Sequence, residues 1–217
     1  MKLFIFEHCP FCIKATMLAG YKNIDIEMVY LQNDDVDARI EKVGANMVPI
    51  LQKESGEYMA ESLDIVAYLD EKTGSTLKPS KFEDQLNTWF DEYRMLLNTL
   101  IMPCWTQLDK PLKEFQSEAA KDWFESNKSK FIGMSFEEAR KTKNQFLPQI
   151  NEALQELNFI SLPSDNDNCL SYDDIQLYPF IRNLTVVEGV QFPAHLIRYV
   201  DEVTELTGTR TFYECAL

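Results

Sequence analysis

The sequence predicts two parts of different fold class, an α/β domain followed by an all-α domain. Over residues 1–74, short segments with the alternating apolar pattern of strands are followed by segments with the periodicity of helices. Beyond residue 84 the strand pattern stops, and apolar residues recur at spacings of three and four. The stretch between the two has the Gly, Ser and Pro content of a linker. We therefore expect domains at 1–74 and 85–217, joined by a linker at 75–84.

The α/β part begins with alternating strands and helices and ends in a hairpin and a helix. Its predicted strands are 2–6, 26–31, 48–52 and 57–60, and its predicted helices are 10–21, a short one that ends at Gly44, and 62–71. The two hairpin strands are separated by a turn around Ser55-Gly56. The order βαβ and then ββα is typical of a thioredoxin-like domain.

The second part is predicted to be a set of amphipathic helices. Each has one apolar face, so each should bury that face against its neighbours. The predicted helices are 86–100, 136–157, 172–187 and 193–206. Ser171 and Asp174 have the spacing of a helix-capping pair, which gives them a structural role.

Composition and charge exclude several classes of function. The 217 residues have a net charge of −14 without a basic patch, which makes nucleic acid and anionic membranes unfavourable partners. No apolar run approaches the roughly 18 residues that a membrane span needs, and the amino terminus does not resemble a signal peptide. The five cysteines make an odd count, unlike a secreted disulfide framework. We therefore expect a cytoplasmic protein.

The pair Cys9-Pro10-Phe11-Cys12 is the candidate for chemistry. A cysteine attacks only as the thiolate, and an ordinary thiol with a pKa of about 8.5 is mostly protonated at neutral pH. Cys9 is predicted at the start of a helix, where unpaired N–H groups and the helix dipole stabilise an anion, and Pro10 suits the first helical position. Cys12 lies one turn further on and should be more covered. We expect Cys9 to be the nucleophile and Cys12 the thiol that resolves a mixed disulfide.

Zinc binding is the alternative interpretation of this pair, because Cys-x-x-Cys also begins zinc fingers and ribbons. A complete zinc site needs two further ligands at short spacing. The other candidates, His8, His195, Cys104, Cys169 and Cys215, do not form a second pair. The βαβ context favours redox chemistry, and we expect no metal.

Four motifs resemble those of the large bacterial glutaredoxins of the glutaredoxin 2 type. They are His8-Cys9-Pro10-Phe11-Cys12, Met47-Val48-Pro49-Ile50-Leu51, Glu61-Ser62-Leu63-Asp64-Ile65 and the run from Asp173 to Thr185. The resemblance extends over nearly the whole chain and implies a glutathione-transferase-like fold. It also implies a glutathione-dependent thiol–disulfide oxidoreductase that acts as a monomer on disulfide-containing or glutathionylated proteins.

The same resemblance implies a glutathione site. Pro49 should be cis, which leaves the Val48 backbone to pair with the cysteinyl part of glutathione like an added strand. Glu61 and Ser62 should hold the γ-glutamyl end at a helix start. Phe11 stands where many glutaredoxins have Tyr, so the site keeps an aromatic wall and loses a hydroxyl. Lys14, one turn further along, is expected on a solvated helix face and outside the site.

Two other functions remain open at this point. An omega-like cysteine-type glutathione transferase or dehydroascorbate reductase shares the fold and a Cys-Pro-Phe start, although Cys12 favours the dithiol reaction. A non-catalytic interaction module would keep the fold and leave Cys9 with an ordinary pKa. The Cys-Gly-Phe-Ser motif of cluster-carrying glutaredoxins is absent from the sequence.

Overall fold

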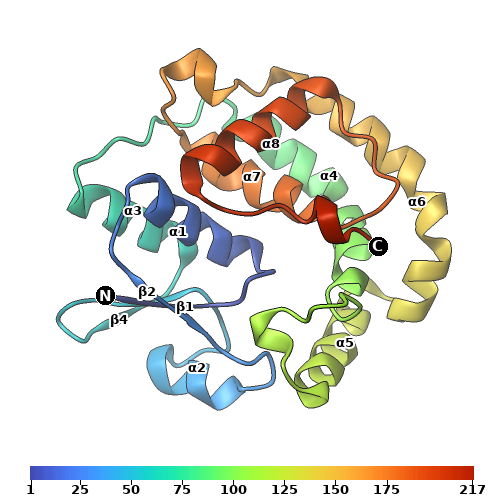
Figure 1. The fold of residues 1–217 in the computed structure, drawn as a ribbon, viewed down its shortest axis with the longest axis horizontal. Coiled ribbons are helices and arrows are strands. Elements are labelled where there is room, and N and C mark those ends of the chain that lie inside the picture. The colour runs from blue at the N-terminus through green and yellow to red at the C-terminus, as the bar shows by residue number, and fades with distance from the viewer.

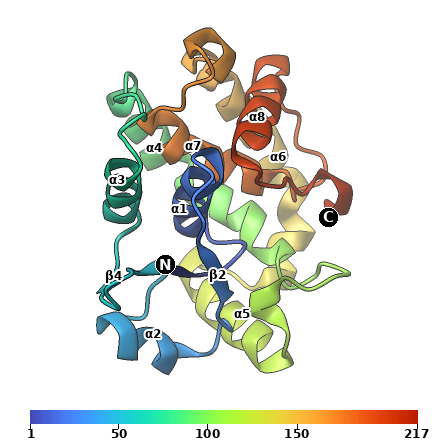
Figure 2. The same cartoon turned by 60° about the vertical axis from the view of Figure 1, so that its left-hand side comes forward.

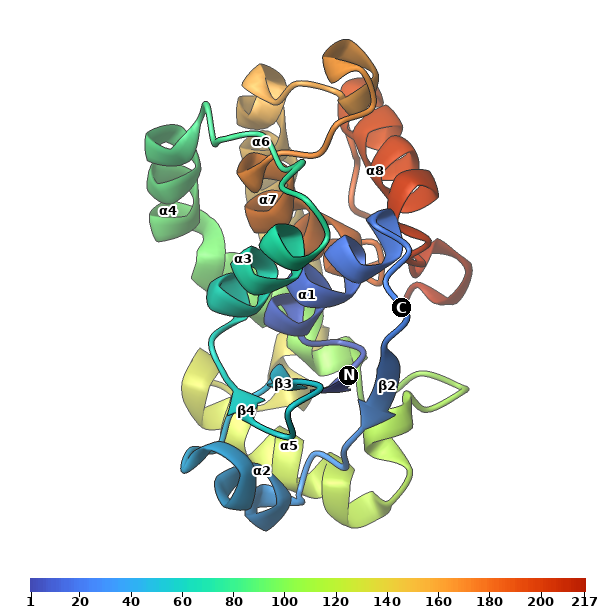
Figure 3. The ribbon, with the colours of Figure 1, turned by 90° about the vertical axis from the view of Figure 1, so that its left-hand side faces the viewer.

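A four-stranded sheet forms the centre of the first part of the computed structural model, which describes all residues 1–217. The strands lie in the order β2-β1-β3-β4, with β1 and β2 parallel and the other neighbours antiparallel. Their bounds are Lys2–Ile5, Glu27–Tyr30, Ile50–Gln52 and Tyr58–Met59 for β1 to β4. Helices α1 (Pro10–Tyr21) and α3 (Ser62–Lys72) lie on one side of the sheet, and α2 (Val36–Val43) lies on the other (Figures 1 and 3). This arrangement confirms the predicted α/β order.

Local sequence explains where the first two helices begin and end. Cys9 is the extended residue that precedes α1, and Pro10 occupies the first helical position, where the missing N–H costs nothing. Asp35 accepts a hydrogen bond from the N–H of Ala38 at the start of α2. Gly44, with φ of 72°, ends that helix in the left-handed conformation that glycine adopts without strain.

Five helices form the second part, one more than the sequence predicts. They are α4 (Glu83–Ile101), α5 (Glu118–Ile132), α6 (Phe136–Glu156), α7 (Tyr172–Leu184) and α8 (Ala194–Thr207). The prediction missed α5 because only Ala120, Phe124 and Ile132 of its fifteen residues are buried, too few for a clear periodic face. Ser171 and Asp174 form the predicted capping box at the start of α7.

The two parts share one hydrophobic core. Helix α1 packs on α3 on one side and on α7 and α8 on the other (Figure 2). The approach to α8 is close, because a Cβ placed on Gly20 would lie 1.9 Å from the carbonyl oxygen of Thr207. A single cluster of 51 buried residues runs from Leu3 to Phe212.

The predicted division of the chain, with a linker at 75–84, stays a prediction, and α4 already begins at Glu83. None of the helices combines the length and apolar character needed to cross a bilayer.

Candidate active site

Cys9 lies where β1 turns into α1, at the junction of the two parts. Its backbone is extended, with φ of −72° and ψ of 117°, and its carbonyl accepts the N–H of Ile13 at 3.1 Å. Cys9 is 9% exposed and lines a cavity between the two parts of the chain, whereas Cys12 is fully buried. Only Cys9 of the pair is therefore open to a substrate.

The surroundings of the two thiols shift their pKa values in opposite directions. The hydrogen bond from the Cys12 side chain lowers the pKa of Cys9, and the N–H groups of Cys12 and Phe11 act in the same direction against the opposing effect of burial. Burial raises the pKa of Cys12 well above its ordinary value, and the neighbouring Cys9 adds to this effect. Both cysteines are free thiols. Cys9 is thus the more acidic thiol of the pair, and Cys12 is its hydrogen-bond donor.

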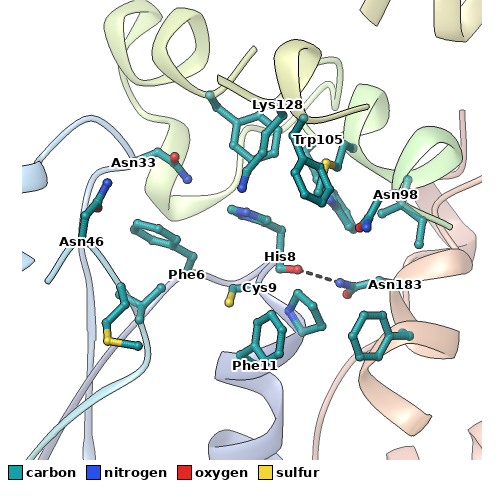
Figure 4. Close-up of a pocket in the computed structure, with 18 of the residues that line it drawn as sticks. Phe6, His8, Cys9, Phe11, Asn33, Asn46, Asn98, Trp105, Lys128 and Asn183 are labelled. Atoms are coloured by element: carbon teal, nitrogen blue, oxygen red, sulfur yellow. Dashed lines mark hydrogen bonds between the residues drawn. The ribbon is translucent and has the colours of Figure 1, made fainter. Parts of the chain in front are cut away.

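Three side chains from the helical part hold the turn that precedes Cys9. The carboxylate of Glu114, in a 3-10 turn at Lys113–Phe115, accepts the His8 N–H at 2.9 Å and lies 2.7 Å from His8 Nδ1. Asn183 Nδ2 donates to the His8 carbonyl at 2.6 Å (Figure 4). Arg182 Nη1 donates to the carbonyl of Glu7 at 3.1 Å. The helical part therefore holds the backbone that leads into Cys9.

Sequence reasoning did not find the contact between His8 and Glu114. Glu114 is fully buried, yet its pKa is lowered: burial alone would raise it, and the hydrogen bonds and charge of His8 outweigh that effect. The His8 ring stacks between Phe6 and Phe115, with ring centroids 5.7 Å and 5.2 Å away. In the sequence Glu114 lies between Lys113 and Phe115 in a largely polar stretch, so no local pattern marks it as buried. Buried acids are also too rare to be predicted without a known partner.

The cavity beside Cys9 has a volume of about 480 Å³ and mainly aromatic and aliphatic walls. Phe11 lies on one wall and is 43% exposed, and Val48 lies on another. The N–H and carbonyl of Val48 form no hydrogen bond within the chain. The Val48-Pro49 peptide bond is cis, and Pro49 is buried outside the cavity lining. The edge at Val48 is thus open to an added strand.

Glu61 and Ser62 lie on a second, adjoining cavity of about 870 Å³. The two cavities share Phe11, Arg94 and Phe180. Glu61 precedes α3 with φ of 66°, and Ser62 is the first residue of that helix. No side chain caps this helix start, so its first N–H groups have no acceptor within the helix. Cys9 and Val48 thus line the first cavity, Glu61 and Ser62 line the second, and Phe11 lines both. The other two predicted site residues, Cys12 and Pro49, line neither.

Lys14 does not lie on a solvated face, and that expectation was wrong. It is 4% exposed, donates to Gln176 Oε1 on α7, and its amino group lies 5.4 Å from the centre of the Phe11 ring. Burial, together with the charge of Arg94, lowers the pKa of Lys14 to about 8. The face of α1 that looked exposed in the sequence is covered by α7, which only the tertiary structure reveals.

No three His, Cys, Asp or Glu side chains lie close enough together to hold a metal ion.

Comparisons with known proteins agree with this geometry. The family model described as glutathione S-transferase, N-terminal domain, matches residues 3–77, and the model described as glutaredoxin 2, C terminal domain, matches residues 85–216. The chain is 36% identical over 208 residues to glutaredoxin 2 of Escherichia coli strain K12, which covers 95% of both chains.

The fold matches solved structures over the same length. The crystal structure of glutaredoxin 2 from Salmonella typhimurium, in complex with glutathione, has a TM-score of 0.92 at 34% identity and covers 100% of this chain and 98% of its own. A glutathione S-transferase of Ceriporiopsis subvermispora has a TM-score of 0.66 at 12% identity, covering 95% and 94%, a likeness of fold alone. The reactive cysteine pair, the two-part fold and the match along the whole chain lead to one conclusion: this protein belongs to the glutaredoxin 2 family.

Proposed function

We propose that Cys9 is the nucleophile and Cys12 the resolving thiol of this glutathione-dependent thiol–disulfide oxidoreductase. The class of reaction follows from membership of the glutaredoxin 2 family. The observation that carries the assignment of roles is the asymmetry of the pair: Cys9 lines the cavity and has a lowered pKa, whereas Cys12 is sealed and has a raised one. The more acidic thiol is present as thiolate and reaches the substrate first.

The reaction on a protein disulfide then proceeds in two exchanges. The Cys9 thiolate attacks one substrate sulfur, forms a mixed disulfide with it and releases the other sulfur as a thiolate that takes up a proton. Cys12 loses its proton and attacks Cys9 Sγ, which releases the reduced substrate and leaves a Cys9–Cys12 disulfide. Cys12 is buried next to the Cys9 sulfur, so it is close enough for this internal attack.

Glutathione returns the enzyme to its dithiol form. One glutathione thiolate attacks Cys9 Sγ, forms a Cys9–glutathione disulfide and returns Cys12 to a thiol. A second glutathione attacks the glutathione sulfur of that disulfide, which yields oxidised glutathione and the Cys9 thiolate. A glutathionylated protein needs only part of this cycle, because Cys9 attacks the glutathione sulfur directly and releases the protein thiol.

We place the cysteinyl part of glutathione on the backbone of Val48, beside the Phe11 ring. The unpaired N–H and carbonyl of Val48, next to the cis bond before Pro49, support this position. The γ-glutamyl end then lies at the start of α3, where Ser62 and the first N–H groups accept a carboxylate and Glu61 accepts the amino group.

Substrate, assembly and compartment are further parts of the proposal. We propose that the protein acts on disulfide-containing and glutathionylated proteins, as a monomer, in the cytoplasm. A reducing compartment supplies the reduced glutathione on which the cycle depends. Light scattering on the purified protein checks the monomer, with a mass close to 25.2 kDa expected.

The decisive experiment compares Cys9→Ser and Cys12→Ser with the wild type. Cys9→Ser should abolish glutathione-coupled reduction of every disulfide. Cys12→Ser should still reduce glutathione mixed disulfides, which need one thiol, and should lose most of the activity on protein disulfides. Cys169→Ser, which removes a half-buried thiol far along the chain, is the matched control and should behave like the wild type. Full activity in Cys9→Ser would disprove the mechanism.

A further inference from the structure

A third cavity, of about 440 Å³, lies behind the turn that precedes Cys9. Its walls come from β1, α1, β2 and the segment after α8, which lie together in Figure 3. Ile5 and Glu7 line it, whereas Phe6 and His8 line the cavity beside Cys9, the alternation expected of a chain that leaves a strand. The two cavities have no lining residue in common, and the reaction proposed above does not use the third one. We call it the rear cavity.

Arg182 brings a buried positive charge to the wall of the rear cavity. The residue is 2% exposed and forms no salt bridge with any carboxylate. Burial lowers the pKa of its guanidinium to about 10. A buried charge without a partner of opposite sign is costly. A cavity on which this charge borders is therefore a place where an anion would be stabilised.

The Arg182 guanidinium also has donors to spare. Its Nε donates to the carbonyl of Arg210 at 2.7 Å, and its Nη1 donates to the carbonyl of Glu7 at 3.1 Å and to Asn183 Oδ1 at 2.8 Å. Nη2 donates to no group of the protein, and it is not one of the polar atoms sealed from solvent. Its two N–H groups are thus available to an acceptor in the rear cavity.

The charges around the rear cavity favour an anion with a single negative charge. The charged side chains in its lining are Glu7, Arg182 and Arg210, and Glu7 forms a salt bridge with Arg210. One positive charge therefore remains, in a protein with a net charge of −14. A second negative charge on the ligand would be repelled by the Glu7 carboxylate. A carboxylate fits this balance better than a phosphate dianion does.

The remaining walls give the ligand an apolar body. Ile5 and Ile13 are buried, and Ile24 and Met28 are half-buried, and all four line the rear cavity. We call these four residues the apolar wall. Hydrocarbon that covers this wall leaves water and is stabilised by the hydrophobic effect.

We propose that the rear cavity binds a monocarboxylate with a short hydrocarbon chain. The carboxylate accepts the Nη2 N–H groups of Arg182, and the chain lies against the apolar wall. The site is separate from the cavity in which the thiols react, so it does not depend on the function proposed above.

The test measures the binding of small probes to the whole protein by isothermal titration calorimetry at constant ionic strength. Hexanoate should bind about tenfold more tightly than hexanamide, which has the same chain without the charge. Acetate, which lacks the chain, should bind at least about tenfold more weakly than hexanoate. Inorganic phosphate should also bind more weakly, because of its second charge.

Two charge variants locate the site, because they should act in opposite directions. Arg210→Gln should weaken hexanoate by about threefold, and Glu7→Gln should strengthen it by about the same factor. Arg198→Gln is the matched control and should bind like the wild type. Its side chain is 66% exposed and pairs with Glu202 on α8 outside the cavity, whereas that of Arg210 is 60% exposed and pairs with Glu7.

Arg182→Gln should abolish the preference for hexanoate over hexanamide, and circular dichroism checks that this variant folds. The charge variants keep the proposal open to refutation if it does not fold. Several results would overturn the proposal: no binding of hexanoate, equal affinity of the wild type for hexanoate and hexanamide, or phosphate binding as tight as that of hexanoate. Affinities of Arg210→Gln and Glu7→Gln that equal that of Arg198→Gln would overturn it as well.

Discussion

The acidity of Cys9 depends on a neighbour in the chain and on a helix start, both at residue scale. The helix start follows from the sequence, because Pro10 and the apolar pattern after it mark where α1 begins. The larger effect is the hydrogen bond from Cys12, which lowers the pKa of Cys9. This gives the second cysteine a role in addition to the resolving role proposed for it. Its burial, which makes it a poor acid, keeps its proton in place for that bond.

Replacing Cys12 by Ala should therefore raise the pKa of the Cys9 thiol. Cys12→Ser is the matched control, since its hydroxyl still donates and should keep the pKa of Cys9 closer to that of the wild type. The pH dependence of alkylation by iodoacetamide measures this pKa in each protein. Identical profiles for Ala and Ser at position 12 would contradict the role given to the hydrogen bond.

Lys14 predicts a pH dependence of stability with a definite sign. Its pKa is about 8 in the folded protein and 10.5 in an ordinary lysine, so the unfolded chain holds the extra proton between these values. The free energy of unfolding should accordingly rise with pH over that window, by up to about 3 kcal/mol. Urea unfolding from pH 8 upward should show this rise in the wild type and in Lys130→Met, and no comparable rise in Lys14→Met. If the rise in unfolding free energy persisted in Lys14→Met, another group would be its cause.

At the scale of elements, the sequence predicts those whose signals are local. Helix α1 and the strands around it have clear starts, stops and apolar patterns, and they lie where expected. Helix α5 is the exception, because its contacts with the rest of the core come from three scattered residues. The lining of the cavity beside Cys9 could not be predicted in full, since residues as far apart in the sequence as Asn33 and Lys128 come together there only in the folded structure. The same holds for His8 and Glu114, which are 106 positions apart.

The packing of α1 on α8 gives a prediction at this scale. In an isolated helix Gly20→Ala would be stabilising by about 1 kcal/mol, because alanine is the better helix former. Here the added methyl group would meet the backbone oxygen of Thr207, which cannot rotate away. We expect Gly20→Ala to lower the free energy of unfolding by about 2 kcal/mol or more. A stabilised variant in urea unfolding would show that the two helices can separate freely.

At the scale of the whole molecule, the helical part holds the turn before Cys9. Glu114→Ala would leave two buried donors of His8 without an acceptor, so the free energy of unfolding should fall by about 3 kcal/mol. The rate of Cys9 alkylation should change as well, because the turn loses a support. Glu118→Ala, whose side chain is 82% exposed, is the control and should match the wild type in both measurements.

The same variant has a pH dependence that follows from the lowered pKa of the Glu114 carboxyl. A carboxyl whose pKa is lowered in the folded protein stabilises the fold at any pH above its ordinary pKa. This stability is lost as the pH falls through the lowered pKa. The difference in unfolding free energy between the wild type and Glu114→Ala should therefore shrink in acid. A difference that stays constant down to strongly acidic pH would exclude a charged Glu114.

The wide separation in the chain of the groups that hold the turn before Cys9 has a consequence for biosynthesis. Glu114 and Asn183 emerge from the ribosome long after the first strand and helix, which carry both thiols. A nascent chain therefore displays its two sulfur atoms before their supports exist. These contacts can form only after Asn183 has left the ribosome, so ribosome-bound fragments that stop earlier carry both thiols without the side chains that hold the turn before Cys9.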